Sequence, residues 1–402
     1  MELFVAIIIT LYIGLKIYIS VMQIGYIDVK KNDKPLFLGQ KEFLDAASYA
    51  KTKERVSILE SLVELLVIFF WLSLGFAALG SFVSFESLYL NGVIYIGAFL
   101  FTGFLISLPF DYYKKMVLDK RFGFSQQSVG GFVKDTIKSL LIGAIFTVLL
   151  SIGVIFFIEN FTYWWIYAAI FIIAVVVFAN LLYPTLIAPI FNKFSPLESS
   201  ELKEEIELLL KRCGFKSSGV FVMDASKRDS RLNAYFGGLG GTKRVVLFDT
   251  LVQKLSSSEI ISVLGHELGH YKHGDIYKNI TISSVVILFL FFIFGNLPAG
   301  FFETFGIEQT PYTLIALLIL LSSPITFFIM PLVSYFSRKA EFEADRFGCE
   351  QGSKEGLKNA LLKLVQENKM FPLSHPIYIF FYYSHPPLAK RLEALGFEID
   401  KL

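Results

Sequence analysis

The sequence predicts an all-α, multi-pass membrane protein that also carries a small folded unit of mixed α and β structure. Hydrophobic residues make up 54% of the 402 residues, and the mean hydropathy is +0.59. Both values exceed what a soluble domain normally carries. The apolar residues also gather in seven long runs, and one polar block, at about residues 192–275, interrupts them.

Each apolar run is long enough to cross a bilayer as a helix, which needs about 20 residues for roughly 30 Å of hydrocarbon. The predicted spans are residues 4–24, 61–83, 92–110, 138–158, 163–183, 276–296 and 312–335. The first run follows Met1 and Glu2 and has neither a basic segment before it nor a small-residue cleavage site after it. We therefore expect a retained helix rather than a cleaved signal peptide.

The charges of the connecting loops predict an orientation. Loops 25–60 and 111–137 are rich in Lys and Arg, whereas loops 84–91, 159–162 and 297–311 contain neither. Because basic loops stay in the cytoplasm, we expect the N-terminus outside and the C-terminus inside. The chain then divides into an N-terminal membrane region with five spans (1–191), a cytoplasmic segment (192–275), two further spans (276–336) and a C-terminal segment (337–402).

The net charge and the cysteine count limit the kinds of partner and metal site that we expect. The formal net charge is only +2, and no basic patch with interleaved aromatic residues is present, so we expect no nucleic-acid partner. Cys213 and Cys349 are too few and too far apart for a disulfide framework or a sulfur metal site, so we expect reduced thiols. The expected surroundings are the lipid bilayer, and we expect a monomer.

The polar block has the pattern of a small folded unit. Residues 198–212 alternate acidic and apolar positions with helical spacing, and Gly214 follows as a stop. Short apolar runs at 220–223, 232–236 and 245–248 predict three strands of a small sheet. An exposed strand edge can hold an extended peptide by backbone hydrogen bonds. The alternative is that these strands only pack.

The motif His266-Glu267-Leu268-Gly269-His270 predicts half of a zinc site. A capping box of Ser256 and Glu259 begins its helix, and Gly274 ends it. His266 and His270 are four residues apart, so both imidazoles can reach one metal ion. Glu267 is rotated about 100° from His266, which suits a general base for water at the open metal position. The alternative is two unconnected surface histidines.

A catalytic zinc needs a third protein ligand. Residues 337–345 (SRKAEFEAD) offer Glu341 and Asp345 one helical turn apart on one face, whereas Glu343 points nearly the opposite way. One carboxylate can ligate the metal while the other accepts a hydrogen bond from a ligating histidine. Arg338 shares this face and can orient the carboxylates or bind substrate. The alternative is a solvated helix end.

Together with residues 121–128 (RFGFSQQS), 232–237 (LNAYFG) and 384–392 (SHPPLAKRL), these motifs resemble the integral-membrane zinc proteases of the CAAX prenyl protease type 1 family. The resemblance covers nearly the whole chain. It implies a ring of seven membrane helices around a large water-filled chamber, with one zinc ion near the cytoplasmic end. The residue roles that it implies are zinc ligation by His266, His270 and Glu341, general base catalysis by Glu267, an outer-shell contact by Asp345, oxyanion stabilisation by His385, and substrate binding by Asn233. Independently of the resemblance, we also expect Arg338 and Arg391 to bind substrate.

The implied function is zinc-dependent cleavage of prenylated CAAX-type proteins or peptides near their C-terminus, in a bacterial inner membrane or the ER membrane. One alternative is a heat-shock type membrane quality-control zinc protease, which is typically shorter. Another is a zinc-binding membrane transporter or scaffold, whose ligands should lie inside the spans. His385 has an alternative role in packing or capping before Pro386. For His375 we expect a structural role.

Overall fold

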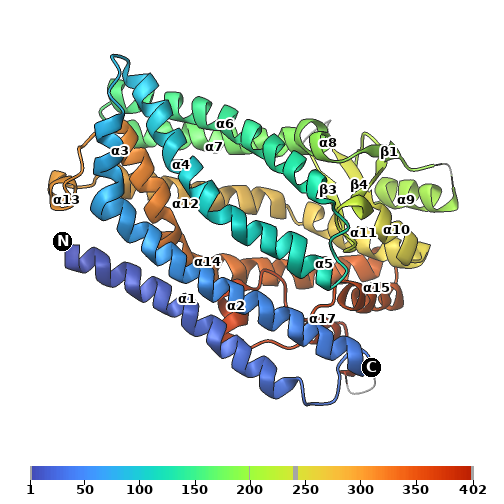
Figure 1. Ribbon diagram of the computed structural model, residues 1–402. Coiled ribbons are helices and arrows are strands. Elements are labelled where there is room, and N and C mark those ends of the chain that lie inside the picture. The colour runs from blue at the N-terminus through green and yellow to red at the C-terminus, as the bar shows by residue number, and fades with distance from the viewer. Residues whose placement is uncertain (1, 199, 239–242, 400–402) are drawn as a thin grey trace.

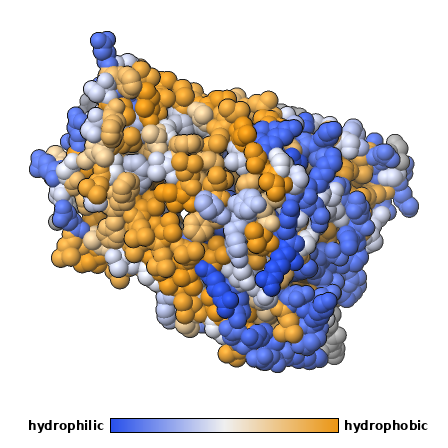
Figure 2. Space-filling view, viewed as in Figure 1, coloured by the Kyte–Doolittle hydropathy of each residue, from blue (hydrophilic) through white to orange (hydrophobic). Residues whose placement is uncertain are grey.

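The computed structural model describes residues 2–198, 200–238 and 243–399, and shows a long helical bundle with a smaller unit at one end (Figure 1). Figure 2 shows apolar residues over the helical bundle and hydrophilic residues over the end of the molecule that carries the smaller unit. Seven helices in the described part of the chain are long and apolar enough to span a membrane, as predicted. They cover Glu2–Lys30, Gln40–Phe82, Leu88–Arg121, Val129–Asn160, Trp164–Phe191, Asp275–Gly295 and Pro311–Gln351.

Three of these spans contain a π-helical turn. Pro184 lies in one such turn and Pro109 shortly precedes another, and proline removes a backbone donor from the helical ladder. The composite spans are α2 (Gln40–Phe70), η1 (Trp71–Gly75) and α3 (Phe76–Phe82); α4 (Leu88–Tyr112), η2 (Tyr113–Leu118) and α5 (Asp119–Arg121); and α7 (Trp164–Leu182), η3 (Tyr183–Ile187) and α8 (Ala188–Phe191). The uninterrupted spans are α1 (Glu2–Lys30), α6 (Val129–Asn160), α12 (Asp275–Gly295) and α14 (Pro311–Gln351).

The helices extend well beyond the apolar runs that identify them. α14 has 41 residues and is therefore about 60 Å long, twice the hydrocarbon thickness. Its second half carries the acidic residues predicted for the site, so the expected boundary at residue 336 lies inside a continuous helix. The expected boundary at 275 coincides with the start of α12.

The bundle is packed differently at its two ends. At the end near the N-terminus, α13 (Ala299–Thr304), α3 and the adjoining parts of α4, α12 and α14 share one apolar core (Figure 1). Toward the other end, cavities of about 560 and 570 Å³ lie between the spans and the mixed unit.

The mixed unit contains a four-stranded sheet in the order β1-β2-β4-β3. Its strands are β1 (Phe194–Pro196), β2 (Val220–Met223), β3 (Ala234–Gly237) and β4 (Arg244–Phe248). β2 and β4 are parallel, and the other pairs are antiparallel. The three predicted strands are confirmed, whereas β1 is too short to show a pattern. β3 forms one edge of the sheet, so one side of its backbone is open to a further strand.

The predicted amphipathic helix is α9 (Glu201–Arg212), which packs on the sheet and on α11 (Ser257–Lys272) in one apolar core. Cys213 and Cys349 are free thiols. The shorter remaining elements are η4 (Ala225–Lys227), α10 (Asp249–Lys254), α15 (Lys354–Glu367), α16 (Pro376–Tyr382) and α17 (Leu388–Ala394).

Candidate metal centre and active site

The helix that carries the two histidines begins and ends as the sequence predicts. The Ser256 hydroxyl accepts a hydrogen bond from the Glu259 amide, and a Glu259 carboxylate oxygen accepts one from the Ser256 amide at 2.7 Å. Gly274 adopts a φ of 71° just after the helix, a backbone conformation that favours glycine. Both ends of α11 are therefore fixed by local interactions.

α11 crosses α14 at very short range because both helices present glycine at the crossing. A Cβ added to Gly269 would lie 2.8 Å from the Ala344 Cα, and one added to Gly348 would lie 2.9 Å from the His266 amide nitrogen. Real Cβ atoms do not approach backbone so closely. Sequence patterns assign these glycines no role, yet the glycines allow the carboxylates of α14 to reach the histidines of α11.

The crossing brings His266, His270 and Glu341 together. One ligand atom from each of the three side chains lies within 4.8 Å of the others. The His270 Nε2 is 3.2 Å from the Glu341 Oε1, and the His266 Nε2 is 3.6 Å from the Glu341 Oε2. The Glu341 Oε2 is buried and makes no hydrogen bond with the described residues. A buried carboxylate oxygen without a hydrogen bond, set between two imidazoles, fits a divalent cation as its missing partner.

Each histidine also contacts a second carboxylate through its other nitrogen. The His266 Nδ1 is 2.9 Å from the Asp345 Oδ1, and the His270 Nδ1 is 2.9 Å from the Asp275 Oδ2. A proton held on Nδ1 leaves the Nε2 lone pair directed toward Glu341. Asp345 therefore lies where the sequence analysis expected an outer partner. Asp275 was missed, although it follows the Gly274 turn five residues after His270.

The carboxylates around His270 favour a positive charge at its ring. Burial lowers the pKa of His270, but hydrogen bonds with Glu341 and Asp275 outweigh that effect and raise the pKa to about 9. The same negative charge would favour a metal ion in place of the proton.

Arg391 ties the C-terminal segment to this cluster. Its Nε and Nη2 donate to the two oxygens of Asp345 at 2.8 and 2.6 Å, and its Nη1 lies 3.5 Å from the Glu341 Oε2. A bidentate arginine fixes the plane of a carboxylate. In the structure, Arg391 therefore contacts Asp345. Its role in substrate binding stays a prediction.

A cavity of about 360 Å³ adjoins the cluster, and the predicted base lies on its wall. Burial raises the pKa of the Glu267 carboxyl, and the neighbouring imidazoles of His266 and His270 oppose this shift. A raised carboxyl pKa suits a group that must both accept and return a proton near neutral pH. The other predicted residues that line this cavity are Asn233, His266, His385 and Arg391.

His385 lies on the segment between α16 and α17 and is the most accessible of the clustered side chains. Its Nε2 is 3.2 Å from the Glu341 Oε1, and 63% of its side chain is exposed, so a substrate can reach it. Its Nδ1 is 2.9 Å from the Ser384 hydroxyl. Asn233 immediately precedes the edge strand β3 and is also exposed.

Arg338 does not line this cavity. Its guanidinium donates to the carbonyl oxygens of Ile379 and Tyr383 at 3.2 and 2.7 Å, and so holds the end of α16 just before the His385 segment. His375 caps α16, where its Nδ1 accepts from the Ile377 amide, in line with the expected structural role.

Comparison with known proteins accords with this arrangement. Residues 196–398, which carry every site residue named above, match peptidase family M48. The chain belongs to peptidase family M48. Residues 35–193 match the CAAX prenyl protease N-terminal family, described as five membrane helices. The protein is therefore a membrane metallopeptidase, and the transporter or scaffold alternative is wrong.

The similarity to individual relatives covers most of the length of this peptidase. The human CAAX prenyl protease 1 homolog is 35% identical over 334 residues, which are 72% of this chain and 70% of the relative. CAAX prenyl protease 1 of Saccharomyces cerevisiae is 37% identical over 317 residues, 74% of this chain and 70% of the relative. The crystal structure of S. mikatae Ste24p superposes with a TM-score of 0.88 at 29% identity and covers 98% of this chain and 99% of that one. This agreement along the chain favours the CAAX protease type over the shorter heat-shock type.

Proposed function

We propose that this metallopeptidase is a zinc endopeptidase that cleaves prenylated CAAX-type proteins or peptides near their C-terminus. The observation that carries the proposal is the group His266, His270 and Glu341, whose ligand atoms lie within 4.8 Å of one another beside a cavity that Glu267 also lines. The substrate class comes from the relatives, which are named CAAX prenyl proteases. We further propose a bacterial inner membrane or the ER membrane as its location, with the active site facing the cytoplasm.

The donor set suits zinc. Two imidazole nitrogens and one carboxylate oxygen are common ligands of a catalytic zinc, which keeps one position open. His266, His270 and Glu341 would hold the ion, while Asp345 and Asp275 orient the two rings. When bound, zinc lowers the pKa of a water molecule toward about 7 and polarises a carbonyl group.

Glu267 performs the proton transfer. In the hydrolysis, the oxygen of a water molecule bonds to the scissile carbonyl carbon, and the C–N bond breaks. Glu267 accepts the proton that the water loses and passes it to the nitrogen of the leaving amine. The raised pKa of this carboxyl favours the first transfer and keeps the proton on Glu267 until the amine is ready to leave.

His385 and the edge strand position the substrate. The Nε2 of His385 lies beside Glu341 on an exposed side chain, so it can donate a hydrogen bond to the oxygen of the scissile carbonyl as negative charge develops there. β3 can pair with an extended peptide, and Asn233 at its start can bond the peptide backbone or side chain.

The direct test uses purified protein and paired CAAX peptides, one prenylated and one not, with products identified by mass spectrometry. We expect cleavage near the C-terminus, with faster turnover of the prenylated peptide. Equal turnover of both peptides would contradict the role of the lipid. Failure to cleave either peptide, or cleavage only far from the C-terminus, would overturn the proposed substrate class.

A further inference from the structure

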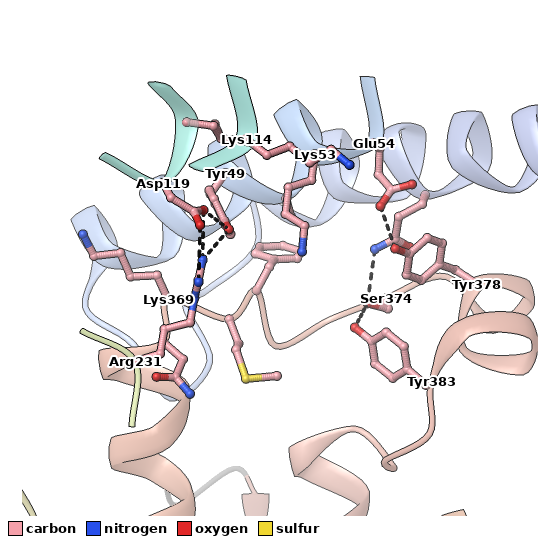
Figure 3. A pocket seen from close by; sticks show the side chains of 16 residues that line it. Tyr49, Lys53, Glu54, Lys114, Asp119, Arg231, Lys369, Ser374, Tyr378 and Tyr383 are labelled. Carbon is pink, nitrogen blue, oxygen red and sulfur yellow. Dashed lines mark hydrogen bonds and ion pairs between the residues drawn. The ribbon is translucent and has the colours of Figure 1, made fainter. Parts of the chain in front are cut away.

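The cavity of about 360 Å³ beside the metal cluster is called the metal cavity below. A second cavity, called the cationic cavity, lies beside it, between α2, the helical segment η2–α5 and the segment before α16 (Figure 3). Its volume is about 560 Å³, within the usual range for a ligand site. Four basic and two acidic residues line it. They are Lys53, Lys114, Arg231, Lys369, Glu54 and Asp119.

Three of the four basic residues are already engaged. Arg231 forms an ion pair with Asp119, and Lys114 forms one with Glu60 on α2. The Lys369 Nζ donates to a backbone carbonyl oxygen, that of Phe122, at 2.6 Å.

Lys53 differs from these three. No ion pair or hydrogen bond involves its ammonium group within residues 2–198, 200–238 and 243–399, and its Nζ lies 5.5 Å from the centre of the Tyr49 ring. Figure 3 shows Lys53 extending from α2 into the cavity, with Tyr49 beside it. The cavity thus holds an ammonium group that is available to an anionic ligand.

The cationic cavity adjoins the metal cavity. Asn368 and Met370 line both. Arg231 of the cationic cavity is followed directly by residues 232–234, which line the metal cavity. Residues 231–234, which lead into the edge strand β3, therefore run from one cavity to the other.

The far end of the same strand leads to a third cavity of different character. Tyr235, Phe236 and Gly237 line a space of about 570 Å³, together with residues of the membrane-spanning α7 and α12. The side chains that these two helices contribute are mostly apolar: Ile173, Val176, Val177, Ile276, Ile280 and Ile287, beside the polar Asn180, Asn279, Ser283 and Ser284. Residues 231–237 therefore pass the cationic cavity first, then the metal cavity, and last the mostly apolar cavity beside α7 and α12.

We propose that the cationic cavity binds the C-terminal carboxylate of the substrate and that Lys53 is the residue that recognises it. The proposal rests on the proposed function, because a CAAX substrate ends in a free carboxylate near the bond that is cut. Cleavage within or next to a four-residue motif leaves at most four residues beyond that bond, which span about 14 Å when extended. A pocket for this carboxylate must therefore adjoin the metal cavity, as this one does.

The arrangement also sets the direction of the substrate. The cationic cavity is at the start of β3, so a peptide whose C-terminus lies there runs antiparallel to the strand. The prenylated end then points toward the apolar cavity of α7 and α12, where a lipid finds apolar surroundings. Only in this antiparallel direction does the C-terminal carboxylate meet the basic residues while the prenyl group meets the apolar residues of α7 and α12.

The test measures kcat and KM for a prenylated CAAX peptide with a free C-terminal carboxylate and for the same peptide as a C-terminal amide. Wild-type protein should prefer the carboxylate peptide by about tenfold or more in kcat/KM, as expected for a charge-assisted hydrogen bond. Lys53→Met should bring this preference close to one, mainly through a higher KM for the carboxylate peptide. Lys53→Arg should restore part of it, since the positive charge is kept.

The matched control is Lys41→Met, which removes an exposed lysine of the same helix that does not line the cavity. It should retain the wild-type preference. A Lys53→Met protein that keeps the preference, or a wild-type protein that cleaves both peptides equally, would overturn the inference and leave the proposed function standing. If wild-type protein cleaves neither peptide, the proposed function itself fails and the inference fails with it.

Discussion

The His270 Nδ1 lies 2.9 Å from the Asp275 Oδ2, although the two residues belong to successive helices. The turn at Gly274 folds α12 back so that its first residue faces the ring of a predicted metal ligand. Asp275 thereby performs for His270 the task that Asp345 performs for His266. Each imidazole is held by a carboxylate that is not one of the three predicted ligands.

Asp275→Ala should weaken metal binding. The His270 ring would lose the partner that holds its tautomer and orientation, and loss of such a partner typically reduces metal affinity or activity by about 10- to 100-fold. Metal affinity by chelator competition measures the effect. Asp33→Ala, which removes an exposed aspartate far from the cluster in sequence, serves as the control. Wild-type affinity in the Asp275 variant would show that the contact does not support the ligand.

Glu341→Ala should lose both metal and peptidase activity, whereas Glu343→Ala should stay close to wild type. Glu341 is buried between the two histidines, and Glu343 lies two residues on, outside the group that could hold an ion. Elemental analysis of the purified variants, alongside peptide cleavage, gives the comparison. Metal retained by the Glu341 variant and lost from the Glu343 variant would identify the other carboxylate as the ligand.

Gly348→Ala should destabilise the protein by about 1 to 3 kcal/mol, because the added methyl group would press on the His266 backbone and force α11 and α14 apart. Gly143→Ala in α6 is the matched control, since a Cβ there meets nothing within 4 Å, and it should be neutral or slightly stabilising. Thermal unfolding in detergent compares the two. Equal unfolding temperatures for both variants would contradict the close crossing of α11 and α14.

Orientation in the membrane is testable with single cysteines in a variant that lacks Cys213 and Cys349. Cysteines at Lys31 and Lys120 should resist an impermeant thiol reagent added outside cells, and one at Glu303 should react. Glu303 is exposed on α13, at the opposite end of the bundle from α5 (Figure 1). The reverse labelling pattern would place the metal centre on the other side of the membrane.

Local sequence patterns predicted much of this structure because they depend on neighbours a few residues away. The capping box at Ser256, the position of His270 one helical turn after His266, and the shared face of Glu341 and Asp345 all follow from helical periodicity. The seven spans follow from apolar length. Hydropathy marks only the part of a helix inside the bilayer, however. The predicted span 312–335 is therefore shorter than α14, which continues to Gln351.

The rest depends on how distant segments cross. The glycine contacts between α11 and α14, and the bond from Arg391 to Asp345 46 residues away, require the angle and separation of packed helices. The spacing of residues along one helix does not reveal the angle or the separation between two helices. The cationic cavity likewise combines Lys53 with Lys369, from segments that only the folded chain brings together.

Catalysis by this protein, as proposed, requires Glu267 to act as the base next to an intact metal centre. The most direct measurement is the metal content and the cleavage rate of Glu267→Gln on the same purified sample. The three ligands remain in this variant, so we expect one zinc per chain, as in the wild type, with cleavage reduced by about 10²- to 10⁴-fold. A metal-loaded Glu267→Gln protein that cleaves the peptide at nearly the wild-type rate would contradict the account.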